Sequence, residues 1–174
     1  MAADKKYAFL MIKYNTPSFI KDIQKQLSDD DLYVNNDENS NFHYGKENDT
    51  HVTLVPCLDN DVNIDNIKKM LKPLSDYQIF LTNVSKFDNK EYEVLKCDVA
   101  SMPLFNTNYI IRSKYKTHTE YNEYHPHITI AYVKHGVADK FCKDALDRLI
   151  MLEPTSFWFS YYDKNWRKQE MLWK

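Results

Sequence analysis

The feature that most constrains the fold is a pair of short apolar segments at matching places in the two halves of the chain. Residues 51–55 run His-Val-Thr-Leu-Val, and residues 127–131 run His-Ile-Thr-Ile-Ala. The alternation of polar and apolar side chains predicts a β-strand with one buried face at each place. Around both segments the pattern predicts the same order: strand, helix, loop, short strand, helix, strand. The sequence therefore predicts an α+β chain of two similar lobes with antiparallel sheets.

Hydrophobic periodicity and turn residues predict the other elements. In the first half we expect strands at 7–14, 51–58 and 77–87. We also expect a helix that Thr16 and Pro17 open, with Ile20, Ile23 and Leu27 on one face. A second helix is expected through Ile64, Ile67, Met70, Leu71 and Leu74. In the second half we expect strands at 92–99 and 127–133, and a hairpin in which 155–162 pairs with 168–173 around a turn at 163–165. We also expect a helix from Ser101 to about Tyr115, and another with Ala138, Phe141, Ala145 and Leu149 on one face. Residues 35–50 are expected to form a polar loop before His51, either a lid or an untethered insertion.

Composition limits the class of protein. The 174 residues suffice for one domain, expected to span 1–174 with lobes at roughly 1–90 and 91–174. Two glycines cannot supply a glycine-rich phosphate loop or a dinucleotide fingerprint. A formal net charge of −2 disfavours a long nucleic acid as partner, and no apolar run is long enough to span a membrane. Three scattered cysteines and the polar start favour a reducing compartment, so we expect a cytoplasmic location, the host's if the chain is viral.

The two short segments carry the strongest chemical signal. Because side chains alternate across a strand, His51 and Thr53 share one face, and so do His127 and Thr129. If the two halves are related by an approximate two-fold axis, the two polar faces meet across one cleft. Two imidazoles can then accept and donate protons near neutral pH, while two hydroxyls bind phosphoryl oxygens. This set of side chains suits cleavage of a phosphodiester without a metal or other cofactor.

The repeated pattern His-hydrophobic-Thr-hydrophobic resembles that of the 2H phosphoesterase superfamily. The stretch from Tyr124 to Lys134 is similar to the second motif of its phage-associated branch, which includes the anti-CBASS nucleases that cleave cyclic di- and trinucleotide signals of bacterial immunity. The resemblance implies a bilobal, LigT-like fold with two pseudo-symmetric lobes around a central groove. It also implies that the two His–Thr pairs are catalytic and that the substrate is a cyclic oligonucleotide.

We therefore expect a metal-independent phosphodiesterase that hydrolyses 3′–5′ bonds of cyclic di- or trinucleotide immune signals. One histidine acts as general base and the other as general acid. Two alternatives stay open. One is an enzyme that opens 2′,3′-cyclic phosphates of RNA or cleaves 2′,5′-linked oligonucleotides, and the other is a binding protein that holds the nucleotide without cutting it.

Residues near the ends of the expected strands are candidates for substrate contacts. Tyr14 and Tyr132 end strands beside the expected groove and can stack on a base. Lys134 can meet phosphate charge, as can Lys13 and Arg112, although most lysine and arginine side chains are solvated at the surface.

A zinc site is the main chemical alternative at the second segment. His125 and His127 have the i, i+2 spacing of ligands on a strand, and His135 follows nearby. Against this hypothesis, no further ligand has suitable spacing, and His51 is left unexplained. Cys57 is interpreted as a small buried residue rather than a nucleophile, because no activating pattern surrounds it.

Overall fold

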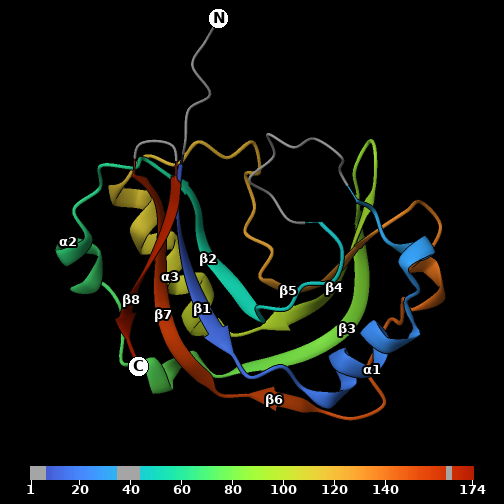
Figure 1. The fold of residues 1–174 in the computed structure, drawn as a ribbon. Helices are drawn as coiled ribbons and strands as arrows, with labels where there is room; N and C mark the ends of the chain where they lie inside the picture. The colour runs from blue at the N-terminus through green and yellow to red at the C-terminus, as the bar shows by residue number, and fades with distance from the viewer. Residues whose placement is uncertain (1–6, 35–43, 164–165) are drawn as a thin grey trace, which may run out of the picture.

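The strands of the computed structural model form one antiparallel sheet that curls strongly (Figure 1). The structure describes residues 7–34, 44–163 and 166–174. Within these residues the strand order is β6-β3-β4-β5-β2-β1-β7-β8. The strands are β1 (Ala8–Tyr14), β2 (His51–Leu58), β3 (Ile79–Asp88), β4 (Glu93–Ala100), β5 (His127–Val133), β6 (Ile150–Leu152), β7 (Pro154–Asp163) and β8 (Trp166–Trp173). The helices are α1 (Ser18–Gln26), α2 (Ile64–Lys68) and α3 (Met102–Lys114). The α+β class predicted from the sequence is confirmed.

The two predicted His–Thr strands meet in the middle of this sheet. β2 and β5 are antiparallel neighbours, and their register pairs Val52 with Ile128. On one side of this pair lie β1, β7 and β8, and on the other side lie β4, β3 and β6. β3 follows β2 in the chain but pairs with β4, and β7 pairs with β1. The expected division near residue 90 therefore falls inside the β3–β4 hairpin, and each side of the sheet takes strands from both halves of the chain.

The sheet has an apolar face and a polar face. Val52, Leu54, Ile128 and Ile130 are fully buried on the apolar face, against which α1 packs at β5 and α3 packs at β2. The intervening side chains of β2 and β5 point the other way, as strand alternation requires. We call this opposite side of β1, β2, β4 and β5 the polar face. Burial of the apolar face drives the fold and leaves the polar face available for chemistry.

Two predicted helices are wrong in extent or kind. α2 ends at Lys68, and the chain continues through Pro73 into a short 3₁₀ turn, Leu74–Tyr77. Proline disfavours helical backbone at the preceding residue, which prevents one helix from running through this segment. The helix expected from Ala138 to Leu149 is a single 3₁₀ turn, Ala138–Lys140, followed by chain that bonds to the edge of β3. Ala138 is buried and Phe141 packs against the core, but Leu149 is 76% exposed, so the expected apolar face is not buried along its whole length.

Smaller expectations at element ends also differ. Thr16 does not cap α1: Pro17 holds the cap position, and the Thr16 hydroxyl hydrogen-bonds the Thr50 hydroxyl at 2.7 Å. The polar loop expected at 35–50, either a lid or an untethered insertion, falls partly outside the described residues, as does the hairpin turn at 163–165. Within the described ranges, no helix combines the length and apolar character that a membrane crossing needs.

Candidate active site

The register of β2 and β5 brings the two His–Thr pairs together on the polar face. Because Val52 lies opposite Ile128 in an antiparallel pair, the adjacent positions place His51 across from Thr129 and Thr53 across from His127. All four side chains are half-buried, whereas Val52 and Ile128 are fully buried behind them. The His–Thr quartet, as we call these four residues, is therefore one compact cluster contributed equally by two strands.

Both histidines are oriented by the same local contact. His51 Nδ1 lies 2.6 Å from the carbonyl oxygen of Asp49, and His127 Nδ1 lies 2.8 Å from that of His125. A carbonyl oxygen can only accept a hydrogen bond, so each Nδ1 must carry the proton and donate it. In the neutral ring the other nitrogen, Nε2, is then the proton acceptor. The two rings thus present the same atom for acid–base chemistry.

The His127 ring contacts an aromatic side chain and lies near several charged groups. Its ring makes an edge-to-face contact with Phe87, with centroids 4.9 Å apart. Burial lowers the pKa of His127 below its ordinary value, and the charges of Lys96 and His51 act in the same direction. The hydrogen bond to the His125 carbonyl opposes this shift. The net result favours a neutral His127 at neutral pH.

A buried lysine lies beside the quartet on β4. Lys96 pairs with Thr129 in the β4–β5 register, and Asp98 pairs with His127. The Lys96 ammonium is bonded to the Asp98 carboxylate and, at 2.6 Å, to the Ser85 hydroxyl. It also lies 4.2 Å from the centre of the Phe87 ring. Lys96 is only 4% exposed, so its charge is fixed in place and weakly screened by solvent.

A second lysine has a corresponding place on β1, beside His51. Lys13 pairs with His51 in the β1–β2 register, and its ammonium lies 4.2 Å from the centre of the Trp158 ring. It also forms an ion pair with Asp49 at 2.7 Å. Asp49 therefore holds Lys13 with its carboxylate and orients His51 with its carbonyl. Lys13 therefore lies beside the quartet, and its contact with phosphate charge stays a prediction.

The residues that the sequence analysis missed are Phe87, Lys96, Asp98 and Trp158. One signal was present: Lys96 and Asp98 are charged residues at i and i+2 in the otherwise apolar run from Val94 to Val99. A charged pair with strand periodicity inside an apolar strand marks one face as functional or ion-paired. The aromatic partners carry no such local signal, because their contacts come from strand pairing alone.

The three residues expected to contact substrate are placed differently from one another. Tyr14 is wrong as a stacking residue: it is 4% exposed on the apolar face, and its hydroxyl donates to the Tyr77 carbonyl at 2.9 Å. Tyr132 lies on the polar face in hydrogen-bond contact with Thr129, and its ring packs edge-on against Tyr44. Lys134 is exposed past the end of β5, about 16 Å along the chain from Thr129. Of these three, only Tyr132 adjoins the quartet.

The zinc hypothesis requires His125, His127 and His135 to converge, and β5 separates them. The strand from His127 to Val133 is extended and spans about 20 Å. His135 lies beyond its end, where Nε2 approaches the Lys90 carbonyl at 3.3 Å. A single metal ion therefore cannot bind all three imidazoles.

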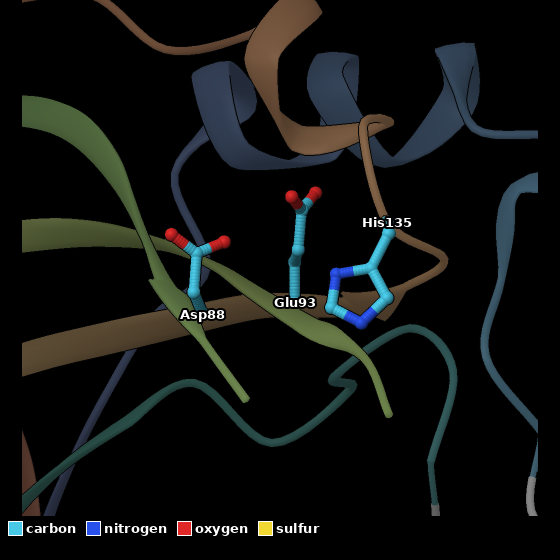
Figure 2. A group of neighbouring side chains, drawn as sticks. All are labelled: Asp88, Glu93 and His135. Atoms are coloured by element: carbon cyan, nitrogen blue, oxygen red, sulfur yellow. The ribbon is translucent and has the colours of Figure 1, made fainter. Parts of the chain in front are cut away.

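His135 instead lies in a different group of possible metal ligands, with Asp88 and Glu93 (Figure 2). The Lys86 ammonium already occupies this group, at 2.6 Å from Glu93, 3.3 Å from Asp88 and 2.8 Å from Asp139. Glu93 also accepts a hydrogen bond from the Ala138 backbone N–H at 3.1 Å. In the β4–β5 register Glu93 pairs with the core residue Val133, so the group belongs to the apolar side of the sheet. We interpret it as a structural ion-pair cluster.

Cys57 has no feature of an activated nucleophile. It is half-buried, and burial raises the pKa of its thiol, whereas a nucleophilic cysteine needs a lowered pKa.

Comparison with known proteins adds a distant structural likeness. No family model matches the sequence, and no curated protein matches it. Among solved structures, the chain is similar to the crystal structure of E. coli LigT complexed with 3′-AMP, with 13% sequence identity. The match covers 97% of this chain and 96% of that chain, with a TM-score of 0.46.

Proposed function

We propose that the protein is a metal-independent phosphodiesterase of the 2H type that cleaves 3′–5′ bonds in cyclic di- or trinucleotides. The observation that carries this proposal is the cross-strand pairing of two His–Thr motifs, with both Nε2 atoms left for proton transfer. Two positioned imidazoles and two hydroxyls supply a base, an acid and donors for phosphoryl oxygens. The similarity of residues 124–134 to the phage branch favours cyclic oligonucleotide signals of bacterial immunity as the substrate.

In the proposed reaction, His127 Nε2 accepts the proton of the attacking hydroxyl, which is either the ribose 2′-hydroxyl or water. The new bond forms between that oxygen and phosphorus, and the bond from phosphorus to the 5′-oxygen breaks. His51 Nε2 donates its proton to the departing oxygen. The lowered pKa of His127 supports its role as base, because a base must be neutral at the operating pH.

The hydroxyls and the lysines have supporting roles. Thr53 and Thr129 lie opposite the two histidines and can donate to the non-bridging oxygens as negative charge develops on them. The charges of Lys13 and Lys96 are held by neighbouring aromatic rings and carboxylates at fixed positions on either side of the quartet. Such fixed charges require little reorganisation during the reaction.

A substrate panel in excess EDTA tests the proposal. The purified protein is incubated with a 3′,3′-cyclic dinucleotide, a cyclic trinucleotide, a 2′,3′-cyclic mononucleotide and a 2′,5′-linked oligonucleotide, and products are separated by chromatography. We expect linear products from the cyclic di- or trinucleotide and no loss of rate with the chelator.

Each other outcome contradicts a specific part of the proposal. Turnover of only the 2′,3′-cyclic or 2′,5′-linked compound indicates the alternative RNA enzyme. Ligand that binds but is recovered intact indicates a binding protein. Activity lost in EDTA and restored by zinc contradicts the metal-independent mechanism.

A further inference from the structure

An open cavity lies at the start of β5, against the two residues that precede His127. It has a volume of about 470 Å³ and is lined by Asp98, Phe105, Tyr124 and the two residues before His127, His125 and Pro126, among others. Asp98 is also the register partner of His127 on β4. The volume is within the range of about 300–1,000 Å³ that is usual for ligand pockets. One lining residue of the cavity, Asp98, is therefore the neighbour of His127 on the adjacent strand.

A second cavity of about 410 Å³ continues the first along α3. The two share Phe105 and Tyr124, and the second adds Arg112 and the side-chain amides of Asn106 and Asn122. Phe105 is 42% exposed, so part of its ring is available to a ligand. Together the two cavities form a tract that extends from His125 and Pro126, the residues before β5, to a guanidinium group on α3.

The walls of this tract are fixed to the strand that carries His51. The Tyr124 hydroxyl donates to the Thr53 carbonyl at 3.0 Å, and the Asn108 amide donates to the Leu54 carbonyl at 2.8 Å. Phe105 packs edge-on against Tyr124, with ring centroids 5.5 Å apart. An aromatic wall anchored by two hydrogen bonds to β2 is a preorganised binding surface.

The chemistry of the lining matches a nucleotide. Phe105 offers a partly exposed ring for a base, because every base has a π-face that can stack on an aromatic side chain. The exposed Glu123 carboxylate, which also lines the cavity, can accept hydrogen bonds from exocyclic amino groups. Arg112 uses one N–H on the Tyr121 carbonyl at 3.3 Å, and its planar group suits phosphate oxygens.

We propose that this tract is the subsite for the nucleoside next to the cleaved bond, with its base on Phe105 and the following phosphate at Arg112. The inference rests on the proposed function, since it takes the scissile phosphodiester to lie at the quartet. It gives a physical reason for a preference for oligonucleotides, because a mononucleotide cannot occupy the quartet and the tract at the same time.

Binding to an inactive form of the full chain tests the subsite. The reference protein carries His51→Ala and His127→Ala, and its Kd for a 3′,3′-cyclic dinucleotide is measured by calorimetry. Adding Phe105→Ala should weaken binding about 5- to 150-fold, the range expected for loss of one stacked base. Arg112→Ala should weaken it as well. Met102→Ala and Lys114→Ala, on the same helix but outside both cavities, are the matched controls and should leave Kd unchanged.

The outcomes separate this inference from the proposed function. Equal Kd values for the Phe105, Arg112 and control variants overturn the subsite while leaving the cyclic dinucleotide as ligand. No binding to the reference protein refutes the proposed substrate and the subsite with it. Circular dichroism and thermal unfolding of each variant establish that any loss of binding occurs in folded protein.

Discussion

At the scale of single residues, the ring nitrogen that each histidine leaves open determines its chemistry. His51 and His127 both donate Nδ1–H to the carbonyl two residues earlier in the chain. This contact needs only a strand that begins at the histidine, so it arises twice from the same local sequence pattern. The difference between the two rings comes from their neighbours. His127 has the Phe87 edge and the Lys96 charge, whereas His51 has Lys13 and Asp49 beside it.

Replacing the buried lysine should raise the pKa of His127. The Lys96→Met variant removes a positive charge that disfavours the protonated His127 ring. The negative charge of Asp98, which favours the protonated ring, remains. The increase is expected because Lys96 lies on the strand next to His127, with its charge held on the same face of the sheet. The measurement is an NMR titration of the His127 ring proton, assigned by its absence in His127→Ala.

The same variant examines the role of His127 as base. If His127 is the base, the low-pH limb of kcat/KM must move upward together with the NMR titration. Lys134→Met, which removes an exposed charge beyond the end of β5, is the control and should move neither. A titration that shifts without the kinetic limb would assign the base to another residue.

At the scale of elements, β4 explains why part of the site was missed from the sequence. Its core-facing positions, Leu95 and Cys97, are fully buried, and Lys96 and Asp98 alternate with them toward the quartet. The alternation was visible, but the function of the charged face depends on β4 lying next to β5. That pairing is set by the whole sheet and not by the local sequence. By contrast, both His–Thr strands were predicted at their observed bounds.

The turn after β5 is fastened to the β3–β4 hairpin by Glu93. Burial alone raises the pKa of this carboxyl, but Lys86 and the backbone N–H groups of Gly136 and Ala138 hold it below its ordinary value. Because the pKa of Glu93 is lower in the folded state than in the unfolded state, its ionised carboxylate stabilises the folded protein. This stabilisation is complete above about pH 4.3, the unfolded-state pKa, and is lost as the pH falls through the folded-state pKa. Glu93→Gln should therefore reduce the free energy of unfolding by about 1–3 kcal/mol at pH 7.

Urea unfolding at several pH values measures this effect. The difference between wild type and Glu93→Gln should shrink as the pH falls below about 4.3, while kcat at pH 7 stays unchanged because the cluster is on the other side of the sheet. A midpoint of unfolding that rises on addition of zinc or magnesium, and does so only with Glu93 intact, would contradict the interpretation of this cluster as structural.

At the scale of the whole molecule, the sequence predicted the elements better than their assembly. Strands β1, β2, β4, β5, β7 and β8 and helices α1 and α3 were expected near their observed bounds, because each has a clear hydrophobic period. The pairing of β1 with β7 joins residues near opposite ends of the chain, and no local pattern encodes such a contact. The two predicted sheets are therefore one continuous sheet, and the two-fold relation between its sides stays a prediction.

The aromatic tract along α3 was missed for a related reason. Phe105 and Tyr109 lie on the outward face of α3, whereas its buried face combines Leu104 and Ile111 with the polar residues Thr107 and Asn108. In the sequence these residues are indistinguishable from core positions. Only the packing of α3 against β2 determines which of them are exposed.

The central claim is that two histidines on neighbouring strands act in one reaction, and the most direct measurement is the rate of cyclic dinucleotide cleavage by a set of histidine variants. His51→Ala and His127→Ala should each lower kcat by about 10²–10⁴-fold, and the double variant should lose far less than the product of the two losses. His135→Ala, at the far end of β5, is the control and should change the rate less than about twofold. If either single variant is folded and retains near-wild-type kcat, or if His135→Ala abolishes the activity, the two-histidine account is wrong.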